Sequence, residues 1–428
     1  MINILKPMLI DKTHKHVYIT FLFIFIALHA DNIMASNNKK YISSSITKLT
    51  FNPKNEKQWI RVGGALSFDQ RGFVGNNMDK GSEFYNGANF RSCEINLIGG
   101  LGKRFFYSFT TNYETKTKRV NTNEAYLIYS INENFGILVG QVFPGFSLEG
   151  LTSYKWQPFL EKSMPTNALG TGLGLGANLV KWNKNYTFIA AAMQPKQGAE
   201  AKDLNGSDLH RNDRWQTSAR FVYRPIYKDK KILQLGASGY FQDDCGAAKR
   251  YTTHTEATSK NHINIIDTGY TKMSASNHKG IDLEMAIQSG SLYGEIEYQR
   301  SFITRPAGKE KLQFYGYHIL TSYVLTGESK TFNDYNGTFG QVFPSSKNGA
   351  WEMAFRYSFL NLNNKDIFGG KGNNISLALI YYLNNNIKIA CEYIRSILHP
   401  SNEALKDSFS NTNKRKLHIL GLRLQAVM

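Results

Sequence analysis

The sequence has few cysteines, and none of them lies in a pattern typical of a metal site or a disulfide framework. There are three cysteines, Cys93, Cys245 and Cys391. Because their number is odd and they are far apart in the sequence, we predict isolated thiols. Prolines and glycines do not gather into a linker, and the composition does not shift abruptly along the 428 residues. One large domain is therefore the simplest prediction.

Long apolar runs are also scarce. The one apolar block, Val17 to Leu28, has 12 residues, whereas a helix that spans a bilayer needs about 20. Basic residues precede this block and small residues follow it, which predicts a secretory signal peptide over residues 1–35, cleaved after Ala35 or Ala30. Retention as a membrane anchor is the alternative. The polar, weakly periodic residues 36–56 are predicted to form a flexible periplasmic arm.

Enzyme motifs are missing as well. The sequence contains no GxSxG, HExxH or EF-hand spacing, and the GLGLG at 172–176 lacks the lysine and serine of a phosphate-binding loop. His318 beside Ser322 is the only faint candidate for a base and a nucleophile, and a buried structural histidine explains it better. We therefore predict a protein that is not an enzyme and needs no cofactor or metal.

The charge balance is strongly positive, at +18. Such a balance is typical of proteins that bind nucleic acid, membranes or anionic solutes. Export removes access to nucleic acid, and the basic residues are spread along the chain rather than gathered in one tract. Small anions and lipopolysaccharide are the predicted partners.

From residue 57 onward, apolar and polar residues alternate, which predicts strands with one apolar and one polar face. The clearest examples are 351–359, 281–287 and 387–393. The last residues alternate too, so the chain is predicted to end on a strand, although it ends on Met428 rather than on the usual phenylalanine.

Turn lengths separate a membrane barrel from a soluble sandwich. Short polar turns are predicted at 100–103, 132–134, 183–185, 289–291 and 384–386. Longer polar stretches alternate with them, at about 70–86, 145–170, 195–213, 242–279, 360–373 and 399–415. Tight turns at one end and long loops at the other are typical of outer-membrane barrels. We therefore predict an all-β, transmembrane antiparallel β-barrel of about 16 strands over 57–428, integral to the Gram-negative outer membrane.

Two connections contain more aromatic residues than a solvated loop needs. The first is 145–170. The second, Gly327 to Gly349, lies at the end of the predicted barrel where the other turns are short. The first is predicted to fold into the lumen as a constriction loop. For the second, inward packing and a miscount of strands remain open.

These residues resemble a known family, the phosphate-selective porins O and P. The stretch GQVFPGFSLEGLTSYKWQPFLEKSMP, Gly140 to Pro165, is similar to its strand and constriction-loop signature. GIDLEMA, SLYGEIEYQR, TSYVLTGE, GAWEMAFRYS and GKG follow in the family's order, so the resemblance covers roughly 57–428.

The resemblance implies a barrel, usually a homotrimer, with arginines staged along the lumen wall and lysines at the constriction. Lys155 stands where the family has its constriction-loop lysine, and Lys330 stands near a second basic position. Asn333 and Phe343 occupy positions where phosphate-selective members have lysines, so phosphate selectivity does not follow.

Five arginines lie on the polar faces of predicted strands and are assigned to the lumen wall, because a charge facing lipid costs about 2–4 kcal/mol. They are Arg61, Arg220, Arg224, Arg356 and Arg423. The alternative is that they brace the barrel by pairing with acids such as Glu94, Glu284, Glu295 or Glu352.

The predicted function is passive diffusion of small anions, with phosphate or polyphosphate as candidate solutes. The alternative is a loop-closed barrel that acts as a surface adhesin or binds lipopolysaccharide through the loop 242–279. An outer-membrane enzyme is a distant third.

Overall fold

The computed structural model describes residues 49–51, 58–75, 86–114, 118–195, 214–244, 249–253, 266–269, 274–400 and 415–428. The predicted signal peptide and most of the predicted arm lie outside the described residues. Within that arm, β1 (Leu49–Phe51) forms a short strand beside β2 (Gln58–Gly75), next to the point where the last strand of the barrel ends.

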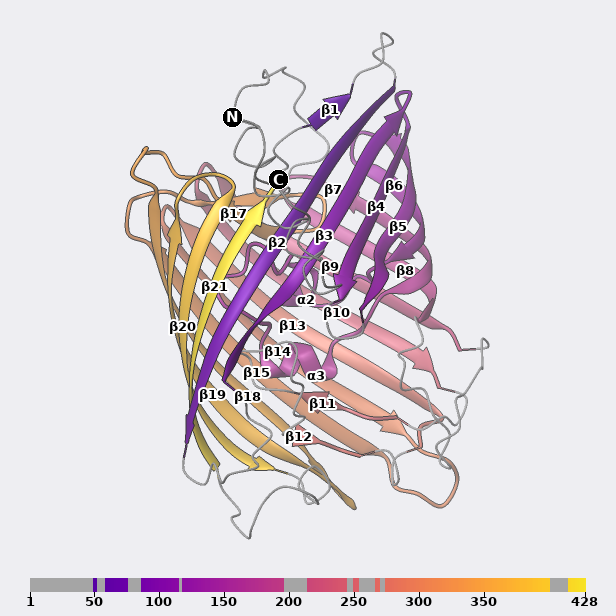
Figure 1. The fold of residues 1–428 in the computed structure, drawn as a ribbon. Coiled ribbons are helices and arrows are strands. Elements are labelled where there is room, and N and C mark those ends of the chain that lie inside the picture. The colour runs from indigo at the N-terminus through magenta and orange to yellow at the C-terminus, as the bar shows by residue number, and fades with distance from the viewer. Residues whose placement is uncertain are drawn as a thin grey trace, which may run out of the picture.

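The prediction of about 16 antiparallel strands is confirmed. The main sheet has 17 strands, of which the short β1 is an addition at one end (Figure 1). The remaining strands form a closed ring, because β2 and β21 pair from Ala65 with Val427 to Gly75 with Leu417. The first nine are β2 (Gln58–Gly75), β3 (Gly87–Leu101), β4 (Phe105–Glu114), β5 (Arg119–Asn132), β6 (Phe135–Val142), β7 (Gly174–Trp182), β8 (Tyr186–Pro195), β9 (Gln216–Lys228) and β10 (Lys231–Asp243). The others are β13 (Asn277–Ser289), β14 (Leu292–Thr304), β15 (Leu312–Val324), β18 (Ala350–Asn364), β19 (Ile367–Tyr382), β20 (Ile387–Pro400) and β21 (Arg415–Val427).

The two faces of each strand differ as the alternation predicts. Large apolar side chains such as Leu283, Met353 and Leu377 are about half exposed on the outer face of the barrel. Exposing so much apolar surface to water would be unfavourable. Their lumen-facing neighbours, such as Asp282 and Glu352, are buried acidic residues. An apolar outer band around a polar interior is the arrangement that a lipid bilayer requires of a barrel. No helix among the described residues is long and apolar enough to cross a bilayer.

The turn asymmetry is also present, with one correction. The predicted long loop 360–373 is wrong, because β18 and β19 continue to Asn364 and from Ile367, joined only by Lys365 and Asp366. Alternation persists there, with Leu362 and Ile367 buried inside. Polar residues on the outer face of a strand that extends beyond the lipid contact water, so their polarity does not indicate a loop.

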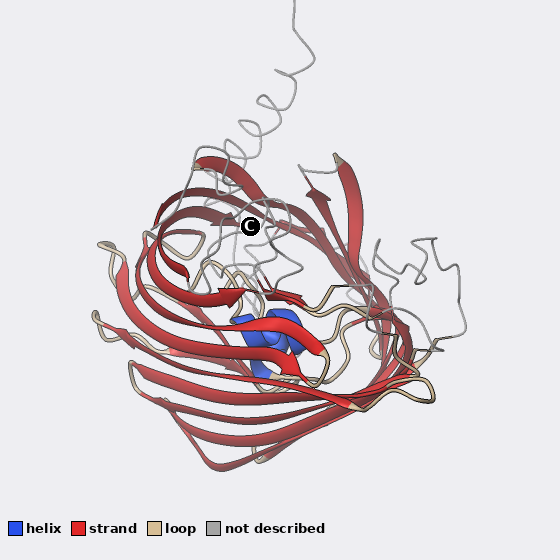
Figure 2. Cartoon of the chain, turned by 90° about the horizontal axis from the view of Figure 1, so that it is seen from below, coloured by secondary structure: helices blue, strands red, loops and turns tan. Residues whose placement is uncertain are grey.

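Two connections fold into the lumen. The segment 143–173, here called the inward segment, contains α2 (Leu148–Leu151) and α3 (Met164–Leu169), which lie inside the ring of strands (Figure 2). The second is the hairpin of β16 (Lys330–Asn333) and β17 (Thr338–Val342), whose Phe339 and Val342 are buried. Inward packing of the second connection is therefore confirmed, and the strand count stands.

Glycines on the barrel wall make room for the inward segment. A Cβ at Gly316 of β15 would lie 2.8 Å from Cγ of Pro165, and one at Gly421 of β21 would overlap Leu160. Such close approach leaves no space for a side chain. The wall sequence is thus fitted to the segment that fills the lumen.

The described parts of the loop 242–279 also lie inside. They include β11 (Thr252–Thr253) and β12 (Ile266–Asp267), and Tyr251 and Ile266 are buried in one apolar cluster with α3 and the strand ends around it. The alternative function as an adhesin needs an outward contact surface on this loop, and its described residues do not form such a surface.

Candidate functional site in the barrel interior

The inward segment is bonded to the barrel wall on several sides. Glu161 accepts hydrogen bonds from Arg91 of β3 at 2.5 and 3.0 Å. The N–H of Leu160 donates to Glu392 of β20 at 2.8 Å. Both of these strands lie on one side of the closed sheet, and Glu297 of β14 bonds the segment on another side, so the segment is held across the lumen.

The start of the segment is held by a single carboxylate. Glu297 of β14 accepts from the hydroxyl of Ser147 at 2.7 Å and from the N–H groups of Leu148 and Glu149. Ser147 also caps α2, since its Oγ accepts from the N–H of Gly150 at 2.9 Å. A short helix with its first N–H groups satisfied in this way is stabilised where it enters the lumen.

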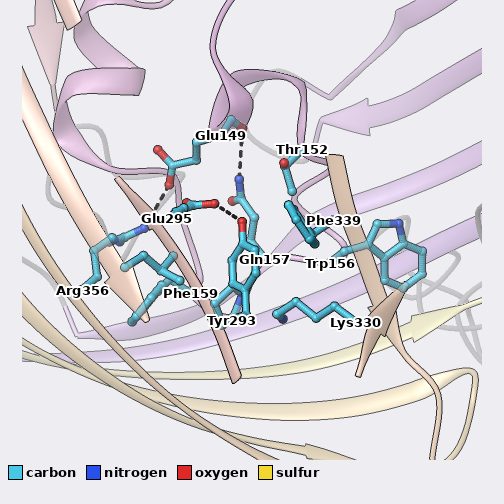
Figure 3. Close-up of a pocket in the computed structure, with 12 residues that line it drawn as sticks. Glu149, Thr152, Trp156, Gln157, Phe159, Tyr293, Glu295, Lys330, Phe339 and Arg356 are labelled. Carbon is cyan, nitrogen blue, oxygen red and sulfur yellow. Dashed lines mark hydrogen bonds and ion pairs between the residues drawn. The ribbon is translucent and has the colours of Figure 1, made fainter. Parts of the chain in front are cut away.

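Glu149 lies at the centre of the segment's interactions (Figure 3). It accepts hydrogen bonds from the N–H and the hydroxyl of Ser163, the latter at 2.6 Å, and lies 3.3 Å from Nη1 of Arg356. Burial alone would raise its pKa, but the charges of His318 and Arg356 and the Ser163 hydroxyl lower the pKa to about 2. Glu149 is therefore ionised and holds α2 against Ser163, the residue that precedes α3.

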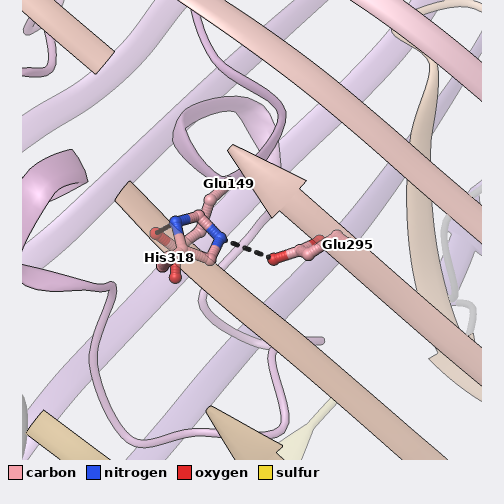
Figure 4. Close-up of side chains that lie close together, drawn as sticks. All are labelled: Glu149, Glu295 and His318. Carbon is pink, nitrogen blue, oxygen red and sulfur yellow. Dashed lines mark hydrogen bonds and ion pairs between the residues drawn. The ribbon is translucent and has the colours of Figure 1, made fainter. Parts of the chain in front are cut away.

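His318 does not pair with Ser322 as a catalytic dyad would require. Its Nδ1 lies 3.2 Å from the hydroxyl of Ser163, and its Nε2 lies 3.2 Å from Glu295 (Figure 4). The histidine connects β14, β15 and the inward segment. The weak enzyme hypothesis finds no support in this geometry.

The two predicted constriction lysines both face the lumen and both have an acidic partner. Nζ of Lys155 lies 2.5 Å from Glu94, and Nζ of Lys330 lies 2.6 Å from Glu352. Asn333 bonds within its own turn, to the N–H of Tyr335 and to Gly337. At both lysines the positive charge is already balanced by a carboxylate.

The five predicted arginines all lie on the lumen side, and four of them are almost completely buried. Arg220 pairs with Glu284 at 2.6 Å and Arg423 with Asp69 at 2.7 Å, each through two nitrogens. Arg356 pairs with Glu149. These three arginines therefore agree with the alternative interpretation, in which lumen arginines brace the barrel by pairing with acids. Among the described residues, no carboxylate forms an ion pair with either of the other two, Arg224 and Arg61.

Arg224 and Arg61 are held in other ways. Arg224 donates to the carbonyl oxygens of Asn183 and Lys184, at 2.5 and 2.8 Å. Arg61 lies over the ring of Trp59, 4.7 Å from its centroid, and its Nε has no partner in the described part of the chain. Neither arginine forms an ion pair with a described residue, although the carboxylate of Asp334 is close enough to Arg224 to interact with its charge.

The structure adds cations that the sequence reasoning left out. Arg71 of β2 is 6% exposed, and its Nε and Nη1 have no partner among the described residues. Lys388 of β20 donates to the carbonyl oxygens of Lys155 and Gln157, at 2.8 and 3.2 Å. Arg71 could have been found, because it shares the period-two register of Arg61, whereas the partners of Lys388 come from a loop.

The lumen therefore has two differently charged walls. We call the side formed by β2, β3, β20 and β21 the basic wall; it carries Arg61, Arg71, Arg91, Lys388 and Arg423 and also the acids Asp69, Glu94 and Glu392. We call the side formed by β13 and β14 the acidic wall; it carries Asp282, Glu284, Glu295 and Glu297. The buried residues of these two fully described strands include no lysine or arginine. The inward segment is bonded to both walls.

A small pocket lies between the inward segment and the wall (Figure 3). Trp156, Phe159, Tyr293 and Phe339 form its apolar lining, and Lys330 contributes charge. It is part of the packing under the segment and offers no separate reaction centre.

Comparison with known proteins agrees with this fold. Porin O of Pseudomonas aeruginosa is 24% identical over 370 residues, which are 79% of this chain and 82% of that protein. Among solved structures, OmpT of Vibrio cholerae is similar with a TM-score of 0.54 and 10% identity, over 88% of this chain and 99% of that one. The channel DcaP of Acinetobacter baumannii is similar with a TM-score of 0.52 and 11% identity, over 88% and 99%.

A third solved structure, an anion-selective porin from Comamonas acidovorans, has a TM-score of 0.51 and 10% identity, over 87% and 100%. At this level of identity the three structures establish the fold. The sequence model of the phosphate-selective porins O and P matches residues 60–427. The chain is thus an integral outer-membrane porin and not an enzyme, and it belongs to the phosphate-selective porin O and P family.

Proposed function

We propose that this porin is a passive diffusion channel for small anions, with phosphate among its solutes. The observation that carries the proposal is the lumen face of β2. Arg61 and Arg71 lie on that face with guanidinium N–H groups that have no partner in the described part of the chain. They are ten residues apart along one strand, a separation of about 33 Å.

Unpaired guanidinium donors suit a dehydrating anion, because a charged N–H donor to an oxyanion is stronger than a neutral one. Two such groups, one near each end of the strand, favour entry without creating one deep site that would trap the solute. Lys388 and Lys162 add positive charge, and their amines donate to backbone carbonyl oxygens rather than to carboxylates.

Selectivity for phosphate over other anions is not part of the proposal. Lys155 is balanced by Glu94, and Asn333 and Phe343 stand where selective members have lysines. The description of the matching family as phosphate-selective porins and the name of the structurally similar anion-selective porin support the choice of anions as the solute class. The net charge of +18 supports it as well.

The test is conductance of the purified porin in a planar bilayer. In a potassium chloride gradient, we expect a zero-current potential of the sign that chloride selectivity gives. Added phosphate is expected to reduce the chloride current in a saturable way. A cation-selective potential would refute the proposal, and an absence of any channel current would favour the loop-closed alternative.

We also infer that the mature chain begins after Ala35 or Ala30 and assembles as a homotrimer. A trimer form of Vibrio cholerae OmpT has a similar fold. N-terminal sequencing of the membrane-inserted protein is expected to start at Ser36 or Asp31. Cross-linking in native outer membranes is expected to give a trimer band, and a monomer alone would contradict this assembly.

A further inference from the structure

Three carboxylates of the acidic wall lie unusually close together. Asp282, Glu284 and Glu297 come from adjacent strands and are 0%, 5% and 0% exposed. Each offers one oxygen, and these oxygens all lie within 4.8 Å of one another. Three like charges at this distance in a buried site need a compensating positive charge.

The protein compensates two of the three. Glu284 receives two hydrogen bonds from Arg220, and Glu297 receives the hydroxyl and the two N–H groups at the start of the inward segment. No donor from outside the cluster bonds to Asp282 in the described part of the chain; its side-chain contact is with the carboxyl group of Glu297, and two carboxylates in contact need a proton or a cation between them. A fully buried carboxylate of this kind is the part of the cluster that needs a ligand.

We propose that Asp282, Glu284 and Glu297 bind one hard divalent cation of the calcium class. Oxygens that each lie about 2.4 Å from one ion are at most about 4.8 Å apart, and the three oxygens of this cluster lie within that limit. All three ligands are carboxylate oxygens, the kind that calcium prefers over softer metals.

The residue opposite Asp282 fits the same ligand. Gln299 pairs with Asp282 in the register of β13 and β14, so the two side chains lie on the same face. Gln299 is 1% exposed, and its side-chain oxygen has no partner among the described residues. Amide oxygens are common calcium ligands, so Gln299 is the candidate fourth protein ligand.

The other buried cluster, Glu149, Glu295 and His318, is a poorer choice for an ion. His318 is engaged through both ring nitrogens, by Ser163 and Glu295. Arg356 already compensates Glu149. That cluster therefore has its positive charge from the protein itself.

The cation would have two consequences. It would fix Glu297, and through Glu297 the start of the inward segment. It would also remove negative charge from the acidic wall, which otherwise works against anion entry. The inference rests on the geometry of the carboxylates and stands whether or not the channel proves anion-selective.

The test is calcium binding to the folded porin in detergent. After treatment with a chelator and its removal, titration with calcium chloride by calorimetry is expected to give one saturable site per chain. Asp282→Asn is expected to weaken this site at least tenfold. The control Asp366→Asn, which changes a carboxylate in the outer turn between β18 and β19, is expected to bind calcium like the wild type.

Thermal unfolding gives a second readout. Calcium is expected to raise the melting temperature of the wild type and leave that of Asp282→Asn unchanged. Absence of a saturable site in the wild type would overturn the inference and indicate that the carboxylates share a proton. Equal calcium binding by wild type and Asp282→Asn would overturn it too, since the ions would then lie elsewhere. The wild-type titration decides this first point even if the variant does not fold.

Discussion

The basic wall and the acidic wall are built from the same kind of strand, yet they differ in what they leave unpaired. On the basic wall, Arg61 and Arg71 have N–H donors with no partner among the described residues. On the acidic wall, no described donor from outside the carboxylate cluster bonds to Asp282. The inward segment connects the two walls, with Glu161 bonded to one and Ser147 to the other.

The alternation of the sequence decides whether a side chain faces the lumen or the lipid. The neighbours of a charged side chain in the folded protein decide whether its charge is already paired or available to a solute. Arg423 and Arg71 are neighbours on the basic wall, but Arg423 forms two hydrogen bonds with Asp69, whereas Nε and Nη1 of Arg71 have no partner in the part of the chain that the structure describes. Walls of opposite charge on two sides of a narrow lumen create an electric field across it. Under the proposed function, we expect an anion to be drawn along the basic wall.

The largest expected effect is on the attachment of the inward segment. Arg356→Met is expected to lower the free energy of unfolding by about 3–5 kcal/mol, because it leaves the buried Glu149 without its guanidinium. Urea unfolding in lipid vesicles, followed by tryptophan fluorescence, measures this. Lys365→Met, in an exposed pair with Glu310, is the control and is expected to change stability by less than about 0.5 kcal/mol. Equal stabilities of the two variants would contradict the account.

Acid is expected to loosen the same attachment. The pKa of Glu149 is lowered from 4.5 to about 2. Its stabilisation is therefore complete above pH 4.5 and is lost as the pH falls toward 2, by about 3 kcal/mol at 1.36 kcal/mol per pKa unit. Unfolding of wild type and Glu149→Gln across this range measures it. Identical pH slopes for the two proteins would show that Glu149 does not carry the effect.

Lys155→Ala is expected to destabilise the porin by about 2 kcal/mol, since it leaves Glu94 buried without its partner. The double variant Glu94→Gln with Lys155→Ala is expected to recover most of this loss in a double-mutant cycle. Because the charge of Lys155 is balanced, Lys155→Ala is also expected to shift the zero-current potential less than a change at Arg71. A larger shift would restore Lys155 as the dominant selectivity residue.

Arg71→Glu is expected to lower the ratio of anion to cation permeability about tenfold, equivalent to about 1.4 kcal/mol. It replaces unpaired donors on the basic wall by an acid. The zero-current potential in a salt gradient measures the change. Lys365→Glu makes the same charge reversal in an outer turn and is the matched control; a similar shift in both variants would mean that net charge alone sets the selectivity.

Much of the fold could be predicted from the sequence, because a barrel in lipid must alternate residue by residue. The lumen positions of Arg220, Arg356 and Arg423 follow from that rule, as does the inward folding of 145–170 from its aromatic residues. The stretch 360–373 misled the prediction, because strands that rise above the membrane no longer need an apolar outer face.

The pairing of charges could not be predicted in the same way. Glu149 and Glu161 come from a segment that crosses the lumen, so their distances to Arg356 and Arg91 depend on how that segment docks. Asp282 and Glu297 are close because of the register in which β13 and β14 pair, and this register cannot be derived from the sequence alone. Whether an arginine braces the wall or meets a solute is therefore a property of the folded interior.

The most direct test of the central claim is the zero-current potential of the wild type beside that of a double variant, Arg61→Glu with Arg71→Glu, in the same potassium chloride gradient. The account predicts anion selectivity in the wild type and its loss or reversal in the double variant. An unchanged anion-selective potential in the double variant would contradict the claim that the basic wall guides the solute.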